Sequence, residues 1–326
     1  MTPRVLAMIC CAASLAPAVA QEDLKTAPPK LALQVTTDPA TVECRRIEKL
    51  DPMSSGFLSL HRTFHDDFDE HPLARRRWVP HYAGGAVWPE SRYWGGDGSD
   101  FKRKDAWNGE QQIYVDPLYR GRSTAPLGLD PFKIRDGVLS IVASRTPPEL
   151  KQVLFNNEYT SGILTTQGAF SQKYGYFEIR SKIPVGTGVW PAFWMLADDG
   201  GWPPEIDVLE GRGQRPGDLV MTTHWRQPPQ TGRVESCGFD FAQPDAATAF
   251  HDYGVLWLKD RIIYFIDRKA VSDISVPMGF DDPMYMIVNL AMGAKNFQGV
   301  GFVDGESPDR VEFQIDRISA YQIDGY

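Results

Sequence analysis

Three acidic residues, Glu205, Asp207 and Glu210, lie within six consecutive positions and are separated only by aliphatic residues. Alternate residues of a strand point to the same face of a sheet, so Glu205 and Asp207 would share one face. Strict alternation would send Glu210 to the opposite face. One extra residue in the pair Val208–Leu209, a β-bulge, brings Glu210 back beside the other two carboxylates.

Carboxyl groups gathered in this way suit the cleavage of glycosidic bonds. In a retaining glycosidase one carboxylate attacks the anomeric carbon, while a protonated carboxyl group about 5–5.5 Å away protonates the departing oxygen. An aspartate between the two adds charge that separates their pKa values. The competing interpretation is a helix start, with Pro203 or Pro204 in the first turn and the acids near the positive end of the helix dipole. Strand-rich flanks and nearby tryptophans favour the strand.

The elements that would position these residues are short strands separated by Gly, Pro and Asp, with no long helical stretch. Period-2 alternation and apolar runs predict strands at residues 137–142, 176–183, 253–258, 262–266, 284–290 and 311–321. The fourth follows the third after the break at Lys259–Asp260, which indicates a hairpin. The pattern predicts an all-β fold of two packed antiparallel sheets.

The N-terminal residues differ from the rest of the chain. Residues 1–20 combine a short basic start, an apolar run and an Ala-Val-Ala site, so we expect a signal peptide cleaved after Ala20. Residues 21–56 are polar and rich in Pro, which indicates a leader or linker, and the sandwich domain is expected at 57–326. No later apolar run is long enough to span a bilayer. The expected location is therefore secreted or periplasmic.

Charge and cysteine content restrict the partners. The net charge of −8 over 326 residues repels phosphate backbones, which argues against nucleic acid. After signal cleavage Cys44 and Cys237 remain. They could form a disulfide in an oxidising compartment or be two unrelated thiols, and their surroundings do not complete a metal site. A monomer is the expected state.

The sequence from Glu205 to Glu210 resembles the active-site signature of family 16 glycoside hydrolases in its longer, bulged form. Further motifs occur in the order that this family shows, and the resemblance extends over residues 64–321. The motifs are Trp107–Gln112, Tyr159–Gly162, Tyr174–Arg180, Trp190–Trp194, Thr223–Trp225, Val288–Ala291 and Ile315–Ile318. Within the family, the overall sequence pattern is similar to that of the laminarinase-like enzymes and of the bacterial exopolysaccharide β-glycanase branch.

The resemblance implies a jelly-roll sandwich of two curved antiparallel sheets, of the concanavalin A-like kind, with a cleft on the concave face. It implies Glu205 as nucleophile, Glu210 as general acid and then general base, and Asp207 as the helper between them. No cofactor is required for this chemistry. A structural calcium is implied with Asp316 as a ligand, although an acid in a terminal strand is also unremarkable.

The resemblance also implies residues that bind a polysaccharide substrate. Tryptophan rings would stack on sugar faces, and polar side chains would bind hydroxyl groups or carboxylates. For Glu178 and Arg180 an ordinary cross-strand ion pair is the rival interpretation, and for each tryptophan the rival is core packing. The implied residues are Trp190, Trp194, Trp202, Glu178, Arg180, His224, Trp225 and Asn108.

The predicted function is a secreted endo-acting β-glucanase that hydrolyses internal β-1,3 or mixed β-1,3/1,4 linkages with retention. Two segments depart from the family pattern and would border the cleft, at residues 116–129 and 292–297. Because of these two segments, the sequence does not identify the polysaccharide that is the substrate. The alternatives are an exopolysaccharide depolymerase, a transglycosylase and a non-catalytic glucan-binding protein.

Overall fold

The computed structural model describes residues 42–47, 59–82, 103–105, 107–227 and 232–325. The predicted signal peptide and most of the predicted leader lie outside the described residues. Within them the chain forms strands and one short helix, α2 (Pro148–Lys151). No helix in the described part of the chain is long and apolar enough to cross a membrane.

The larger sheet has eleven strands in the order β1-β15-β14-β13-β8-β17-β5-β6-β3, with β2 also paired to β17 and β4 to β5. Every pairing is antiparallel except that of β3 with β6. Its strands are β1 (Cys44–Arg46), β2 (Leu60–Asp66), β3 (Gln112–Tyr114), β4 (Phe132–Arg135), β5 (Val138–Arg145), β6 (Tyr159–Ser161), β8 (Gly175–Lys182), β13 (His251–Trp257), β14 (Arg261–Ile266), β15 (Lys269–Ser275) and β17 (Arg310–Ile323).

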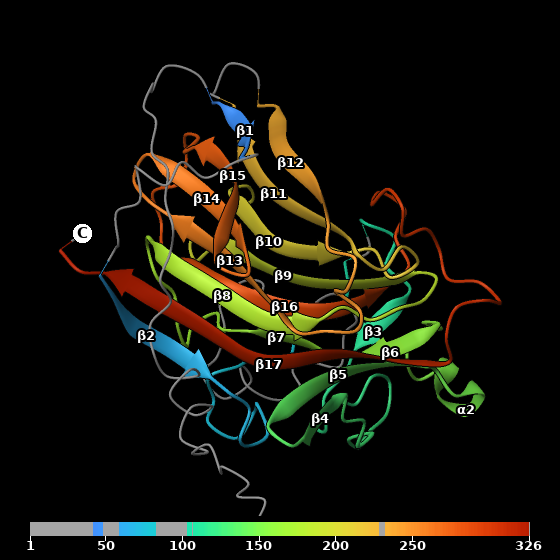
Figure 1. Cartoon of the computed structure of the whole chain (residues 1–326). Helices are drawn as coiled ribbons and strands as arrows, with labels where there is room; N and C mark the ends of the chain where they lie inside the picture. Colours follow the sequence, from blue (N-terminus) through green and yellow to red (C-terminus); the bar gives the residue numbers. More distant parts are fainter. Residues whose placement is uncertain (1–41, 48–58, 83–102, 106, 228–231, 326) are drawn as a thin grey trace, which may run out of the picture.

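The smaller sheet has six strands in the order β12-β11-β10-β9-β16-β7. Its strands are β7 (Ile163–Thr165), β9 (Val189–Ala197), β10 (Glu205–Gly211), β11 (Asp218–Arg226), β12 (Val234–Ala242) and β16 (Met284–Met292). Figure 1 shows the two sheets stacked on each other. The predicted all-β sandwich is confirmed, and residues 205–211 form a strand rather than the start of a helix.

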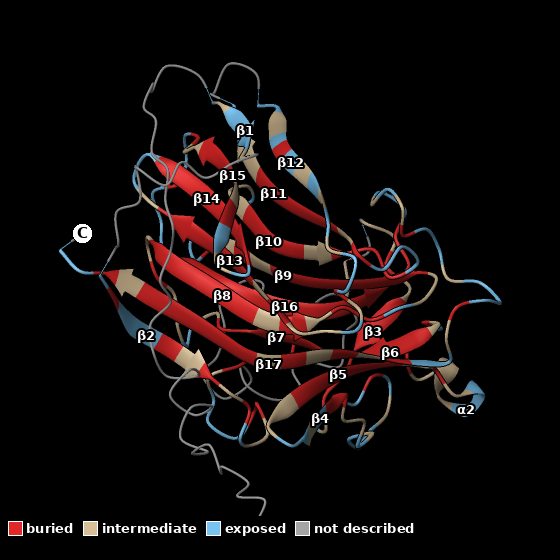
Figure 2. Cartoon of the chain, in the orientation of Figure 1, coloured by how far each residue is buried: buried red, intermediate tan, exposed pale blue. Residues whose placement is uncertain are grey.

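The core lies between the sheets because alternate residues of each strand are apolar. On β8 Phe177 and Ile179 point into it, and on β10 Ile206 does so from the other side. Figure 2 shows buried residues along the central strands of both sheets, with exposed residues concentrated at the edges and in the loops. The residues next to the inward-facing ones therefore lie on the outer faces of the sandwich, which is where a site can open to solvent.

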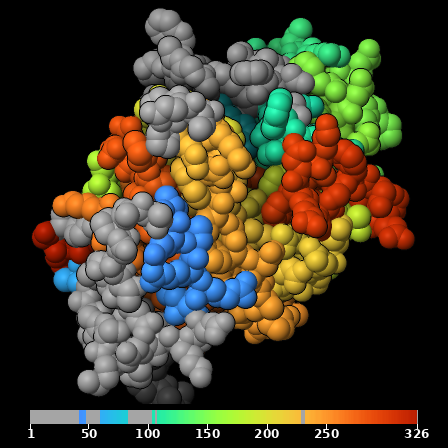
Figure 3. Space-filling view, turned by 90° about the horizontal axis from the view of Figure 1, so that it is seen from above, coloured from blue at the N-terminus to red at the C-terminus, as the bar shows by residue number. Residues whose placement is uncertain are grey.

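The segment at Cys44 belongs to the fold, which differs from the expected domain boundary at residue 57. Strand β1 pairs with β15 at the edge of the larger sheet. Cys44 is disulfide-bonded to Cys237 of β12, with the two Cα atoms 6.2 Å apart. Of the two interpretations left open by the sequence, the structure has the disulfide. Figure 3 shows β1, in blue, lying against the chain around β12. The bond joins an edge of one sheet to an edge of the other.

Candidate active site

Strand β10 carries the three acids on the face turned away from the core, and a β-bulge makes this possible. Asp207 pairs with Trp194 of β9, whereas Leu209 pairs with the next residue, Phe193, so Val208 is the extra residue. The register on the β11 side shifts in the same interval. Val208 and Leu209 are both buried in the core. The predicted bulge is confirmed, and it returns Glu210 to the face of Glu205 and Asp207.

These acids line a cleft whose other walls come from the neighbouring strands β9 and β16 and from the chain before β3. The residues that line it are Tyr82, Asp105, Asn108, Glu110, Trp190, Ala192, Trp194, Glu205, Asp207, Glu210 and Asn289. Six residues of this set were predicted from the sequence as site residues, namely the three acids, Trp190, Trp194 and Asn108. The fold therefore brings together residues from five separate parts of the chain.

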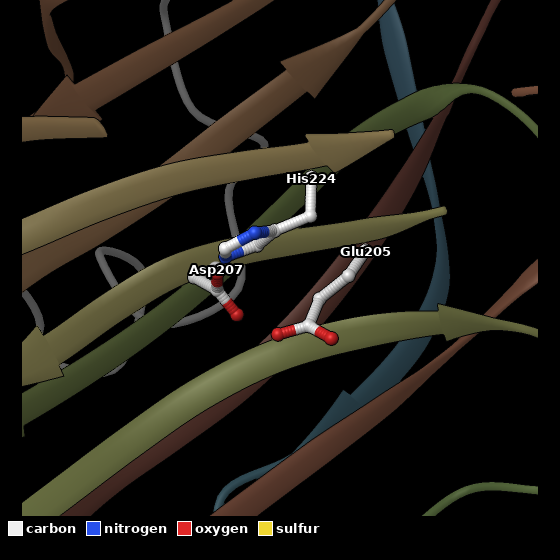
Figure 4. Close-up of side chains that lie close together, drawn as sticks. All are labelled: Glu205, Asp207 and His224. Atoms are coloured by element: carbon white, nitrogen blue, oxygen red, sulfur yellow. Dashed lines mark ion pairs between the residues drawn. The ribbon is translucent and has the colours of Figure 1, made fainter. Parts of the chain in front are cut away.

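Each acid has its own polar partner. The Trp202 indole N–H donates to Glu205, and the Trp190 Nε1 donates to Oε1 of Glu210 over 3.1 Å. His224, on the adjacent strand β11, places Nε2 3.1 Å from Oδ2 of Asp207. Figure 4 shows the Asp207 and His224 side chains side by side, with Glu205 turned toward them.

The carboxyl groups are buried close together, which favours their protonated forms. Burial raises the pKa of Glu210 to about 8, with a further contribution from the charge of Glu205, while the Trp190 hydrogen bond opposes the shift. Burial and the charge of Asp207 also raise the pKa of Glu205 well above its usual value. For Asp207, burial and the charge of Glu210 raise the pKa. The site therefore holds protons at neutral pH, as an acid catalyst must.

The opposite wall of the cleft is polar. Asn108 donates from Nδ2 to Oδ2 of Asp105 over 3.0 Å, and the Asp105 backbone N–H donates to Glu110. Burial raises the pKa of Glu110 to about 8. On the floor, Trp194 donates from Nε1 to Oδ1 of Asn289 over 2.8 Å. These contacts fix the side chains that a ligand in the cleft would meet.

Sequence reasoning did not single out Tyr82, Asp105, Glu110, Ala192 or Asn289 as site residues. Glu110, Ala192 and Asn289 appeared only inside motifs. A signal existed for Asn289, because it is the single polar residue of the otherwise apolar strand β16. Tyr82 and Asp105 lie in loop segments, where no periodicity indicates a direction.

Glu178 and Arg180 lie elsewhere, which corrects their expected contact with substrate. They are on β8 in the larger sheet, on the face opposite the core-facing Phe177. Glu178 is buried and accepts two hydrogen bonds of 2.9 Å from the guanidinium of Arg268. Arg180 donates to Asp252. The rival interpretation of an ion pair across strands therefore describes Arg180, which lies opposite Asp252 of β13, while Glu178 is paired with Arg268 in the turn between β14 and β15.

Trp225 is also displaced from the expected site. It follows His224 on β11, so its side chain points to the other face of the sheet, where it packs partly buried against the core. Core packing, the rival interpretation, accounts for it. By contrast Trp202 is 51% exposed, and its ring centroid lies 6.5 Å from that of His224.

The surroundings of Asp316 do not fit a calcium ion. Its Oδ2 accepts a hydrogen bond of 2.9 Å from Arg317, and Nε of Arg180 lies 3.6 Å away. Calcium takes six to eight oxygen ligands, whereas this carboxylate already has two guanidinium groups as its partners, and their positive charges would repel a cation. In the described residues, the one group of three acidic or histidine side chains that could hold a metal is Glu205, Asp207 and His224, whose ligand atoms lie within 4.8 Å of one another.

Comparison with known proteins agrees with this geometry. The family described as "Glycosyl hydrolases family 16" matches residues 136–299. The chain is 36% identical over 267 residues to the endo-1,3-1,4-beta-glycanase ExsH of Rhizobium meliloti, covering 81% of this chain and 52% of that protein. It is 35% identical over 266 residues to the endo-1,3-1,4-beta-glycanase EglC of the same organism, with the same coverage. The chain thus spans about half the length of these curated relatives.

A solved structure shows the same fold. The laminarinase from Rhodothermus marinus superposes with a TM-score of 0.60 at 27% identity, covering 82% of this chain and 98% of that chain. This similarity, together with the two-sheet architecture, confirms the sandwich that the sequence resemblance implied.

Proposed function

Because the chain belongs to glycosyl hydrolase family 16, we propose that it is a retaining endo-β-glycanase whose nucleophile is Glu205 and whose acid and base is Glu210. The observation that carries the proposal is the bulged strand β10, which gathers three buried acids on the open face of one sheet. A protein that only bound glucan would gain nothing from burying three carboxyl groups together, since such burial is costly.

In the first step the Glu205 carboxylate attacks the anomeric carbon, the bond to the leaving oxygen breaks, and Glu210 gives its proton to that oxygen. The product is a glycosyl ester of Glu205. In the second step Glu210, now ionised, takes a proton from water while the water oxygen attacks the same carbon and releases Glu205. Two inversions leave the configuration of the sugar unchanged.

The contacts of each acid suit its role. Burial and the charge of Asp207 raise the pKa of Glu205, and the nearby His224 and the Trp202 N–H oppose that rise, so these two contacts favour the ionised form that the attack requires. Burial holds Glu210 protonated at neutral pH. Asp207 contacts His224 and lies close to both glutamates. Its charge therefore influences the pKa values of Glu205 and Glu210.

The substrate we propose is a β-glucan with β-1,3 or mixed β-1,3/1,4 linkages. The support comes from the two similar Rhizobium proteins, whose names state action on 1,3-1,4-β-linkages, and from the superposed laminarinase. Trp190 and Trp194 line the cleft, and the exposed Trp202 is hydrogen-bonded to the proposed nucleophile Glu205. Flat rings are therefore available to pack on pyranose faces. Asn108 supplies an amide for hydroxyl groups.

Export after cleavage at Ala20 and a monomeric state remain part of the proposal. The Cys44–Cys237 disulfide supports an oxidising compartment, where such bonds persist.

The test is release of reducing ends by the protein from laminarin, mixed-linkage β-glucan and a succinoglycan-type exopolysaccharide, with Glu205→Gln as the matched variant. We expect cleavage of at least one polymer and a loss of at least about 10³-fold in the variant, since the covalent step is removed. Products longer than the starting oligosaccharide would indicate transglycosylation. Binding of a polymer without cleavage by the wild type would contradict the enzyme and favour a glucan-binding protein.

A further inference from the structure

One wall of the cleft is the segment that contains Asn108, and this segment is bonded to a loop far away in the sequence, residues 295–303. The Lys295 N–H donates to the Asn108 carbonyl over 2.6 Å, and the Val303 N–H donates to Oε1 of Gln111 over 2.7 Å. Figure 3 shows these two stretches, in teal and red, lying against each other. The two loops therefore form one unit beside the reaction centre.

Glycine allows this close approach. Gly109 has a φ of +75°, and a Cβ atom there would lie 2.8 Å from Cβ of Lys295 and 3.4 Å from Cε1 of Phe302. Both the backbone conformation and the space exclude a larger residue. The wall is thus a built feature of the fold, and Phe302 packs over its glycine while remaining 55% exposed.

Trp107 stands on this wall with its side chain 85% exposed, the most exposed of the large hydrophobic residues in the described part of the chain. Its backbone is fixed on both sides. The Trp107 N–H donates to Oδ1 of Asp105 over 2.8 Å, and its carbonyl accepts from Nδ2 of Asn296 over 3.2 Å. A large ring is therefore presented to water from a held backbone, and a ligand that covered the ring would remove its apolar surface from water.

The next residue in the chain, Asn108, lines the cleft together with the three acids. Neighbouring Cα atoms are about 3.8 Å apart, so Trp107 lies within the reach of a polymer that occupies the cleft and continues past Asn108. We propose that Trp107 is a distal sugar-binding platform, on which a pyranose of the same polysaccharide chain stacks outside the catalytic centre. The inference rests on the proposed function and adds a binding position to it.

The experiment compares Trp107→Ala, Trp107→Phe and the wild type on whichever polymer the wild type cleaves. For Trp107→Ala we expect KM to rise about tenfold with kcat within about twofold, because the ring would bind substrate and transition state equally. Trp107→Phe keeps a flat ring and should stay within about threefold of the wild-type KM. Met278→Ala is the matched control, since Met278 is 66% exposed and is not among the residues that line the cleft.

Retardation of each protein in gels that contain the polymer provides a second measurement that does not depend on turnover. Weaker retardation of Trp107→Ala, with Met278→Ala unchanged, supports the platform. A wild type that cleaves a polymer while Trp107→Ala shows the same KM and the same retardation overturns this inference alone. A wild type that neither cleaves nor is retarded by any of the three polymers overturns the proposed function and this inference together.

Discussion

Trp190, which lines the cleft, donates a hydrogen bond from its indole N–H to the carboxyl group of Glu210, the proposed general acid. An N–H donor stabilises the ionised carboxylate, and removing it should raise the pKa of Glu210 further. In Trp190→Phe the acid would then stay protonated to higher pH. We expect the alkaline limb of the kcat/KM profile to move upward by about half to one pH unit.

Trp194→Phe is the control for that shift. Its indole donates to Asn289 rather than to a carboxylate, so its removal should lower affinity without moving the alkaline limb. Equal shifts in the two variants, or none in either, would show that the indole of Trp190 does not act on the proton of Glu210.

The raised pKa of Glu210 also has a consequence for folding stability. In the folded state the pKa is about 8, above the ordinary value of 4.5, so the folded protein binds more protons between these pH values. Stability is therefore lost as pH rises through this window. Glu210→Gln removes the titration. At about 1.4 kcal/mol per pH unit, we expect the amount by which its free energy of unfolding exceeds that of the wild type to grow by about 3–4 kcal/mol between pH 5 and pH 8. Denaturant unfolding at both pH values is the measurement, and a constant difference would refute the explanation.

The position of a single side chain in the site can be predicted from the sequence best when the residue lies in a strand. The alternation of Glu205, Ile206 and Asp207 fixes which side chains share a face, and the aliphatic pair that follows indicates the bulge. Tyr82 and Asp105 follow no such period, because loops place their side chains through tertiary contacts. Their position in the cleft could not have been predicted from spacing.

Strand β8 shows the limit of the same argument for an element. Period 2 correctly places Glu178 and Arg180 on one face, but it does not tell which of the two sheets the strand joins. The cleft opens on the outer face of the smaller sheet, while β8 lies in the larger one. The two residues therefore belong to a network of charges with Arg268 and Asp252 on the other side of the sandwich.

Arg268→Met tests that placement. It leaves the buried carboxylate of Glu178 without its bidentate partner, and we expect the free energy of unfolding to fall by about 2–4 kcal/mol. KM and kcat measured well below the unfolding temperature should remain those of the wild type, because the pair lies outside the cleft. A clear rise in KM with unchanged stability would instead restore the substrate role that the sequence suggested for Glu178.

A disulfide between Cys44 and Cys237, which are 193 residues apart in the sequence, joins the edges of the two sheets. Strand β1 has only three residues and lies in a Pro-punctuated segment, so neither length nor period could reveal it as part of the sheet. We expect Cys44→Ser with Cys237→Ser to lower the free energy of unfolding by about 2–4 kcal/mol, since a long loop of the unfolded chain is released.

Reduction of the wild type by a thiol reagent should have the same effect on unfolding as the double substitution, and it should have none on the double variant. Activity at 25 °C should be retained in both, because neither cysteine contacts the three acids. Unchanged unfolding in the double variant would show that the edge strand is held without the bond.

The central claim is double displacement at Glu205 with Glu210 as acid and base, and its most direct test is the configuration of the first product. Proton NMR during hydrolysis of a β-glucan by the wild type follows the anomeric signals before mutarotation. We predict that the β anomer appears first and the α anomer only later, with neither signal formed by Glu205→Gln. An α anomer that appears first would mean single displacement by water and would contradict the account.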